Sequence, residues 1–391
     1  MIKSLQLARV TRAEVRLQQT VLVGMSGGVD SSVAAALLHE AGYRVVGITF
    51  NVWPEGDNQS AFREDACCAL GAVEDARRVC DRLGVPHYVV NLRDVFQRRV
   101  IDNFVAEYRQ GRTPNPCVRC NQFIKFDALL AKAEALNADC VATGHYARTT
   151  QLPNGRWALR KAADGRKDQS YVLFVMGQDR LARVRFPLGD LQKGDTRQVA
   201  RDLGLHVADK PESQEICFVP TRNYRDYLRE EAPESFSAGP LVNESGEVVG
   251  QHEGIAMYTV GQRKGIGLAA PQPLYVTQID VKNNTIVVGG QEGLFRTDAL
   301  VEACNWMAIE GLSEPKRVRA KARSHAEEAP AWIEPEGDRV RVIFDEPQRA
   351  LTPGQAIVFY EDDLVVGGGI LAASSARSSA ASSALSIERG S

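Results

Sequence analysis

The sequence predicts an α/β protein in which a parallel-sheet domain is followed by a small β-rich central domain and a C-terminal β-barrel. Residues 21–150 alternate apolar strand patterns with helical patterns, which is typical of a parallel sheet covered by helices. From about residue 220 the pattern changes to strands separated by turn residues. A chain of 391 residues has room for two or three domains.

Composition divides the chain into five segments. They are an N-terminal extension at 1–20, the parallel-sheet domain at 21–218, the central β-rich domain at 219–298, the C-terminal β-barrel at 299–371 and a Ser/Ala-rich, disordered tail at 372–391. The extension is basic, as a mitochondrial transit peptide would be, but it is short and poor in serine. We interpret it as a bacterial extension and expect a cytoplasmic protein, since no apolar run reaches the length of a membrane span.

Apolar runs and turn residues predict the individual elements in chain order. In the parallel-sheet domain we expect strands at 21–23, 45–50 and 140–143, helices at 31–38, 74–83 and 196–203, and a short β segment at 157–161. The central domain should contain a hairpin, with strands at 274–279 and 285–288 joined through Asn283-Asn284. Strands at 339–344 and 356–360 should belong to the barrel.

A glycine-rich loop lies between the first strand and the first helix, with the sequence Gly24-Met25-Ser26-Gly27-Gly28-Val29-Asp30-Ser31. Glycines before a helix form an anion site, because backbone N–H groups point into the turn and the helix dipole adds positive charge. Ser31 and Ser32 can donate hydroxyl groups to phosphate, whereas the Gly-Lys-Ser/Thr of a Walker loop does not occur here. The alternative is an ordinary helix start, but Gly-Gly, Asp and Ser-Ser together favour phosphate binding.

The chain has eight cysteines and no secretory signal peptide, which indicates reduced thiols. Paired cysteines are then interpreted as catalytic or metal-binding. Cys80, Cys140 and Cys304 have apolar neighbours and are expected to be small core residues. Cys67-Cys68 is a vicinal pair for which a redox role stays open.

Two further segments carry cysteines in polar surroundings. The first contains Cys117 and Cys120, and its two prolines predict a loop that enters a helix near Asn121. Arg119 and the helix N-terminus would favour a thiolate there. The second is a loop at 210–218 with Cys217 as its one cysteine. A structural zinc site is not expected, because it needs four nitrogen or sulfur ligands and the sequence offers no second pair.

Together these motifs resemble the tRNA-specific 2-thiouridylases, a family within the ATP-pyrophosphatase superfamily. The resemblance runs from about residue 21 to residue 370. Beyond the glycine loop and the first cysteine segment, it rests on the segments at 142–146, 167–171, 213–218, 258–265 and 351–355. It implies that the first domain has an adenine-nucleotide α-hydrolase-like fold and catalyses the reaction.

The resemblance implies ATP-dependent 2-thiolation of the wobble uridine in the tRNAs for Glu, Gln and Lys. ATP would adenylate the C2 oxygen of uridine, because AMP leaves more readily than oxide. Sulfur would then come from a cysteine persulfide, giving 2-thiouridine, AMP and pyrophosphate. By the family's pattern Cys217 bears the persulfide, and Cys120 is the nucleophile that forms a disulfide with it.

The same resemblance implies cofactors and partners. ATP and Mg²⁺ are expected, with Asp30 orienting Mg²⁺ or the pyrophosphate. The partners are tRNA and a sulfur donor, which is either a cysteine desulfurase or a sulfur-relay protein, and no membrane is involved.

Cys117 marks a departure from the better-known members, which have an acid/base Asp at this position. Two interpretations follow. Cys117 is either a polar loop residue in place of that Asp, or one of three ligands, with Cys120 and Cys217, of a [4Fe–4S] cluster of the kind that related tRNA-thiolating enzymes hold. We favour the persulfide route over the cluster.

Binding positions also carry over from the family. ATP would be bound by Gly24, Met25, Ser26, Gly27, Gly28, Val29, Asp30, Ser31, Phe50 and Gly144. Contacts to tRNA would come from His145, Lys167, Asp168, Gln169, Arg323, Ser324 and Gln355. His145 could instead be a core residue, and the family usually has Arg-Tyr where this chain has Arg323-Ser324.

The net charge of −2 gives no overall signature of nucleic-acid binding. A local one is offered by Arg317, Arg319, Lys321 and Arg323, which alternate along one predicted strand and would share a face. That face is either a phosphate-binding stripe or a solvated edge.

Two other classes of function compete with this interpretation. A ligase-type amidotransferase or synthetase would use the same loop on a small molecule, but it leaves the cysteine segments and the barrel unexplained. An RNA-binding protein with a vestigial nucleotide fold would have no need of an intact loop.

Overall fold

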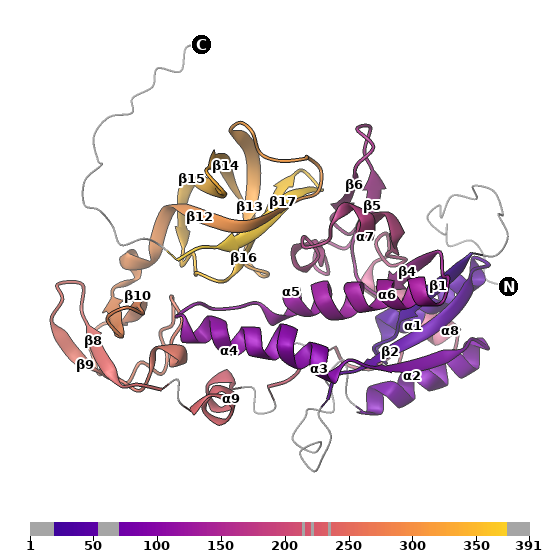
Figure 1. The fold of residues 1–391 in the computed structure, drawn as a ribbon, viewed down its shortest axis with the longest axis horizontal. Coiled ribbons are helices and arrows are strands. Elements are labelled where there is room, and N and C mark those ends of the chain that lie inside the picture. The colour runs from indigo at the N-terminus through magenta and orange to yellow at the C-terminus, as the bar shows by residue number, and fades with distance from the viewer. Residues whose placement is uncertain (1–18, 54–69, 213–215, 220–222, 234–235, 374–391) are drawn as a thin grey trace.

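The computed structural model describes residues 19–53, 70–212, 216–219, 223–233 and 236–373 (Figure 1). Four expectations lie wholly or largely outside the described residues. They are the N-terminal extension, the vicinal pair Cys67-Cys68, residues 213–215 of the second cysteine segment and the C-terminal tail beyond residue 373.

The first domain is built on a parallel sheet with strand order β3-β2-β1-β4-β7. The strands are β1 (Thr20–Gly24), β2 (Arg44–Asn51), β3 (His87–Asn91), β4 (Cys140–Thr143) and β7 (Val184–Arg185). The central strand β1 is buried on both faces: Val21 and Val23 pack on one side and Leu22 on the other. This burial explains its uninterrupted apolar sequence.

Helices cover both faces of this sheet. On the Val21 face lie α1 (Val29–Glu40), α2 (Leu70–Leu83) and α8 (Lys193–Asp202). On the Leu22 face lie α3 (Arg93–Phe96), α4 (Asp102–Arg109), α6 (Ala128–Ala135) and α7 (Gln178–Arg183). The predicted parallel sheet covered by helices is confirmed.

The first cysteine segment corrects the predicted loop. Residues Pro116–Cys120 form the helix α5, which runs through a π-helical stretch, Asn121–Asp127, into α6. Pro116 is the first helical residue, where its missing N–H costs nothing, and the side chain of Asn115 accepts a bond from the Val118 N–H at 3.4 Å. Cys117 and Cys120 therefore lie on a helix, one turn apart.

The central domain is a four-stranded sheet with the order β10-β11-β8-β9, after the short helix α9 (Tyr224–Glu231). Its strands are β8 (Gly239–Val242), β9 (Val248–His252), β10 (Tyr275–Asp280) and β11 (Thr285–Gly289). The predicted hairpin is present, since β10 and β11 pair in antiparallel fashion across Asn283 and Asn284.

The last domain is a barrel of the strands β12 to β17, closed by pairing of the first with the last. The strands are β12 (Phe295–Trp306), β13 (Lys316–Lys321), β14 (Ala329–Glu336), β15 (Arg339–Arg349), β16 (Ala356–Glu361) and β17 (Leu364–Leu371). A hairpin of the first domain, β5 (Arg148–Gln151) and β6 (Trp157–Arg160), joins it where Arg160 pairs with Leu364. In the view of Figure 1 the barrel lies above α4 and α5, and the β5–β6 hairpin lies above α6.

Among the residues described, no helix combines the length and the apolar character that crossing a membrane requires.

Candidate functional site

The glycine loop lies where the strand order of the parallel sheet reverses, between β1 and β4. Gly24, the last residue of β1, is in register with Thr143, the last residue of β4. Open α/β sheets bind ligands at the carboxyl ends of strands at such a reversal. The loop is therefore at the position in this fold where a nucleotide is expected.

Serine side chains hold the loop in shape before any ligand arrives. The Ser31 hydroxyl lies 3.1 Å from the Ser26 N–H and 3.2 Å from the Gly28 carbonyl oxygen, to which Ser32 also donates at 2.8 Å. Gly28 is the N-cap residue, so α1 begins at Val29, two residues before the predicted start. Asp30 then lies in the first turn of a 12-residue helix, next to its free backbone N–H groups.

Two glycines of the site are required by the space around them. Gly27 has φ +65°, and a Cβ there would lie 2.2 Å from the carbonyl oxygen of Ala72. A Cβ on Gly144 would lie 2.5 Å from the carbonyl carbon of Asp30 and from the nitrogen of Ser31. The end of β4 thus touches the first turn of α1, and only glycine permits this approach.

We expect Gly144→Ala to lower affinity for ATP by at least about tenfold, because backbone atoms of α1 must move away from β4. Equilibrium binding of a labelled ATP analogue measures the loss, and thermal unfolding shows how much is global destabilisation. Gly165→Ala is the matched control, since a Cβ there meets no atom within 4 Å. Equal affinity in both variants would contradict the close approach described above.

A charged network beside the loop contains residues that sequence analysis missed. The Lys193 ammonium lies 2.6 Å from Asp30 Oδ1 and 2.6 Å from Glu212 Oε1, and its side chain is 12% exposed. Lys167, a predicted tRNA contact, binds the other oxygen of Glu212 at 2.7 Å. Burial raises the pKa of the Glu212 carboxyl, but the two lysines outweigh it, so this pKa lies below its usual range.

Tyr146 completes the network from the end of β4. Its hydroxyl lies 3.0 Å from Asp30 Oδ1 and 2.9 Å from Thr196 Oγ1. Burial and the neighbouring Asp30 carboxylate raise the pKa of Tyr146, so the hydroxyl stays protonated and donates to Asp30. Asp30 is thus held by one cation and one hydroxyl. The sequence signal for Lys193 was weak, because a lysine at the start of a helix on the surface is common.

The corner of the sheet that holds Phe50 and Met25, two of the predicted ATP-binding residues, is apolar. Phe50, at the end of β2, and Met25, directly after β1, are both buried. Thr49 fixes this corner by donating from its hydroxyl to the Met25 carbonyl oxygen at 2.9 Å. Phe50 belongs to the large core that also contains Val52 and Trp53.

Cys120 and Cys217 are both half-buried and pack against the same hydrophobic core. Phe218 fixes the second segment: its ring centroid lies 5.8 Å from that of Phe96 and 5.2 Å from that of Phe104. The π-helical stretch Gln97–Ile101, which follows Phe96, packs against α5, the helix that carries Cys120. Two segments far apart in the sequence therefore meet at one group of helices.

Cys117 is exposed, on the first turn of α5. Throughout the described residues, which include all three cysteines of the two segments, no three side chains of the His, Cys, Asp and Glu types are grouped so that they could hold a metal ion. An iron–sulfur cluster on Cys117, Cys120 and Cys217 binds each thiol to a different iron atom, so this ligand set stays a prediction.

Two arginines lie at the cysteine helix, Arg119 on α5 itself and Arg99 on the segment that packs against it. The guanidinium groups of Arg99 and Arg119 lie 5.1 and 4.6 Å from the centre of the Phe123 ring. Burial lowers the pKa of Arg119, and the nearby Arg99 lowers it further. Arg119 also lines a cavity of about 500 Å³ between α5 and the barrel, which Asn305 of β12 and Ile370 of β17 help to enclose. Positive charge thus faces the groove next to the cysteines.

His145 is buried between the rings of Phe126 and Phe186. Its Nδ1 lies 2.7 Å from Thr143 Oγ1, and its Nε2 lies 3.5 Å from the Lys125 ammonium. Burial lowers the pKa of His145 well below its ordinary value, and Lys125 adds to this shift, so the ring is neutral. This is the environment of a core histidine, and a contact of the ring with tRNA stays a prediction.

Asp168 and Gln169 bind other parts of the protein. Asp168 accepts bonds from the backbone N–H of Ala162 at 3.0 Å and from the Ser170 hydroxyl at 2.7 Å. Gln169 Oε1 accepts from the backbone N–H of Tyr146 at 2.9 Å. These two residues hold the segment that follows β4, and their contacts with tRNA stay predictions.

The barrel positions differ among themselves. Arg317 and Arg319 project from one exposed face of β13, as predicted, but Arg317 is paired with Asp345 and Arg319 binds Glu328. Arg323 lies beyond the end of β13, where its guanidinium donates to the Arg349 carbonyl oxygen. The expectation that all four cations alternate along one strand is therefore wrong at Arg323.

The other two barrel positions lie apart from that strand. Ser324 is exposed, whereas Gln355 Nε2 donates to the Thr113 carbonyl oxygen at 2.8 Å, just before the cysteine helix.

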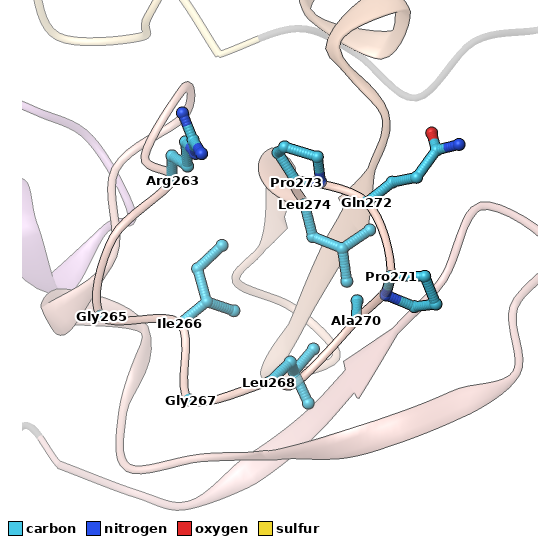
Figure 2. Close-up of a pocket in the computed structure, with 10 residues that line it drawn as sticks. All are labelled: Arg263, Gly265, Ile266, Gly267, Leu268, Ala270, Pro271, Gln272, Pro273 and Leu274. Atoms are coloured by element: carbon cyan, nitrogen blue, oxygen red, sulfur yellow. The ribbon is translucent and has the colours of Figure 1, made fainter.

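The central domain has a cavity of its own, of about 380 Å³, enclosed by the loop between residues 263 and 274 (Figure 2). Figure 2 shows Ile266, Leu268 and Leu274 around it, with Arg263 at the edge of the loop. It includes none of the predicted site residues.

Three family models match the chain in succession. They are the tRNA methyl transferase HUP domain at residues 19–221, the tRNA methyl transferase PRC-barrel domain at 225–290 and the aminomethyltransferase beta-barrel domain at 296–371. These matches confirm the predicted order of a parallel-sheet domain, a small β domain and a barrel.

Several curated proteins are similar over nearly the whole chain. The tRNA-specific 2-thiouridylase MnmA of Symbiobacterium thermophilum is 52% identical over 349 residues, which cover 88% of this chain and 89% of that protein. The protein of the same name from Heliobacterium modesticaldum is 52% identical, with 89% and 91% covered. That from Clostridium perfringens is 50% identical, with 89% and 96% covered.

Proposed function

We propose how this chain, which belongs to the tRNA-specific 2-thiouridylase family, performs the ATP-dependent thiolation of the wobble uridine of tRNA. The observation that carries the mechanism is the meeting of two cysteine segments against one core, in the domain that also bears the glycine loop. A synthetase acting on a small molecule would need neither the cysteines nor the barrel.

In the first step the glycine loop binds the phosphates of ATP, and the C2 oxygen of uridine attacks the α-phosphorus. Pyrophosphate leaves, and the oxygen is now part of an AMP ester. Positive groups at the loop include the N-terminus of α1, the Lys193 ammonium and the Lys210 ammonium, which donates to the Gly27 carbonyl oxygen at 3.1 Å. Their charge supports a role in stabilising the departing pyrophosphate.

We propose that Mg²⁺ arrives with ATP and is held mainly by the phosphates. The described residues contain no group of three His, Cys, Asp or Glu side chains for a resident metal. Such binding, through phosphates and one or two carboxylates, is usual for this ion. Asp30 is the carboxylate nearest the loop, although Lys193 and Tyr146 share one of its oxygens.

In the second step sulfur replaces the AMP oxygen at C2. The terminal sulfur of a Cys217 persulfide attacks C2 and AMP departs, leaving Cys217 joined to the base through a disulfide. The Cys120 thiolate then attacks Cys217 Sγ, and the electrons of the broken sulfur–sulfur bond remain on the base as its 2-thio group. A thiol reductant must reduce the resulting Cys120–Cys217 disulfide before the next turnover.

The partners follow from these steps. A persulfide on Cys217 requires a donor of sulfane sulfur, which we propose is a cysteine desulfurase or a sulfur-relay protein. The tRNA substrates are those for Glu, Gln and Lys, and the enzyme works in the cytoplasm, where tRNA and reduced thiols occur together.

Mass spectrometry of tRNA nucleosides tests the proposal most directly. A strain that lacks its own 2-thiouridylase should regain 2-thiouridine derivatives when this chain is expressed. Complementation by the wild type but not by a Cys120→Ser variant supports the mechanism. Failure of the wild type to restore the nucleoside, although it is folded and abundant, would overturn the proposed substrate.

Cys117 provides a separate prediction. We expect Cys117→Ala to keep activity within about threefold of the wild type, because the proposed persulfide route uses only the thiols of Cys120 and Cys217. Iron and sulfide analysis of protein purified without oxygen accompanies the assay, with Cys304→Ala as the control. Brown, iron-containing wild-type protein that loses iron and activity together in Cys117→Ala would establish the cluster instead.

A further inference from the structure

We propose that the turn at residues 111–114, between α4 and α5, is an anchor through which the central domain and the barrel position Cys120. The inference rests on the proposed role of Cys120 and assigns a positioning role to Arg112 and Thr113. This anchor turn lies beside β10 and below the barrel (Figure 1). Both outer domains hold it, and it leads directly into the helix that carries the cysteine.

The barrel binds the backbone of the anchor turn. The N–H of Thr113 donates to the Pro353 carbonyl oxygen at 2.8 Å, and Gln355 donates to the Thr113 carbonyl oxygen at 2.8 Å. Between them Gly354 has φ +88°, and a Cβ there would lie 2.9 Å from the Thr113 nitrogen. The segment before β16 and the anchor turn thus pair closely, with both backbone polar groups of Thr113 satisfied.

The central domain packs on the other side. Gly111 has φ +63°, and a Cβ on it would lie 2.8 Å from Ile279 Cγ2 and 2.9 Å from Val281 Cγ2. The Thr113 hydroxyl donates to the Thr259 hydroxyl at 3.2 Å. Two independent contacts, one apolar and one polar, therefore fix the turn against this domain.

Arg112 joins two of the domains through charge. Its guanidinium lies 2.7 Å from Glu107 of α4 and 2.7 Å from Glu302 of β12, and the side chain is 15% exposed. Burial lowers the pKa of Arg112, but Glu302 and Glu107 outweigh it and raise the pKa above its usual value. A half-buried arginine held by two carboxylates contributes far more to stability than an exposed ion pair, because removing the arginine leaves both carboxylates without a counter-charge.

The anchor turn is connected directly to α5, and so to Cys120. Asn115 caps α5 and Pro116 is its first residue, so the turn and the helix have no flexible segment between them. A shift of the anchor turn moves Cys120 relative to Cys217, because α5 follows the turn, whereas the Cys217 segment packs on Phe96 and Phe104, which precede it. Transfer between two thiols tolerates little displacement. tRNA bound across the outer domains would consequently influence sulfur transfer without touching the cysteine.

Arg112→Gln tests the proposal, with Arg341→Gln as the matched control. Arg341 also binds two carboxylates, Glu336 at 2.6 Å and Asp298 at 3.2 Å, but all three residues lie within the barrel. We expect Arg112→Gln to slow single-turnover sulfur transfer by at least about tenfold, while adenylation and affinity for tRNA change by no more than about twofold. The control should leave all three quantities within about twofold.

The accessibility of Cys120 gives a readout independent of turnover. The rate of its alkylation, measured by peptide mass spectrometry, should change at least about threefold in Arg112→Gln and stay at the wild-type value in Arg341→Gln. If Cys120→Ser proves fully active, the proposed function fails, but the alkylation rates still test the anchor. Unchanged alkylation together with unchanged sulfur transfer in Arg112→Gln would overturn it.

Thr259→Val is a second, milder test, in case Arg112→Gln loses activity only because it does not fold. It keeps the shape of the side chain and removes a single hydroxyl from the central domain, so the fold should persist. We expect a smaller effect than in Arg112→Gln: sulfur transfer slows by about threefold, while the rate of adenylation is preserved. A decrease in adenylation equal to that in transfer would show general damage and count against the anchor.

Discussion

Replacing Cys120 or Cys217 with serine abolishes 2-thiouridine formation while adenylation of tRNA continues. The expected loss is at least about a thousandfold for each variant, because serine neither carries a persulfide nor attacks one, and the two thiols act as one unit. The glycine loop keeps its shape through hydrogen bonds of Ser26, Ser31 and Ser32, in which neither cysteine takes part. Release of labelled pyrophosphate and thiolation are measured on the same samples.

Cys304→Ser is the control for this pair. Cys304 is half-buried like Cys120 and Cys217, but burial raises the pKa of its thiol to about 11, so it is an inert thiol. It should keep full activity. Near-normal thiolation in Cys120→Ser or Cys217→Ser would show that the proposed two-thiol transfer is wrong.

Asp30→Ala and Lys193→Met each remove adenylation, which is the second large effect. Asp30 and Lys193 form one ion pair at the phosphate loop, so either change removes one charge of that pair, although Lys193 keeps Glu212 and Asp30 keeps the Tyr146 hydroxyl. We expect a decrease of about a hundredfold in pyrophosphate release, the size typical for loss of one group that stabilises developing charge. Persulfide loading of Cys217 should continue, because transfer of sulfane sulfur to a thiol consumes no ATP.

Arg183→Gln serves as the comparison for these variants. Arg183 pairs with Glu134 at 2.7 Å on the surface of the same domain, and such pairs contribute little. Normal pyrophosphate release in Asp30→Ala would mean that this residue merely begins a helix. Normal pyrophosphate release in Lys193→Met, with release lost in Asp30→Ala, would mean that Lys193 stabilises the fold and takes no part in adenylation.

Local patterns predicted most of the fold. The apolar strands around β1 and the alternation of strands and helices follow from burial on both faces of a parallel sheet, which leaves a strong signal in sequence. The cysteine helix was missed because prolines were treated as breakers. Asn115-Pro116 is in fact a helix start, with a capping side chain followed by a residue whose φ is already helical.

Contacts between distant segments could not be predicted in this way. Lys193, Glu212 and Asp30 come from three separate segments, and each alone resembles an ordinary surface charge. Arg112 is likewise unremarkable until Glu302 of the barrel lies beside it. The spacing of apolar residues indicates which face of a helix or strand is buried, but not which charged side chains meet when the elements pack.

The hairpin that joins the first domain to the barrel has a consequence for how the chain is made. Asp363 binds both Arg148 and Arg160, and the Tyr171 hydroxyl donates to the Ala356 carbonyl oxygen. One continuous core also contains residues from both domains. During synthesis the N-terminal part emerges first, and Arg148 meets its partner Asp363 only after a further 215 residues have been made. The first domain therefore completes its own interior only after the last strand has left the ribosome.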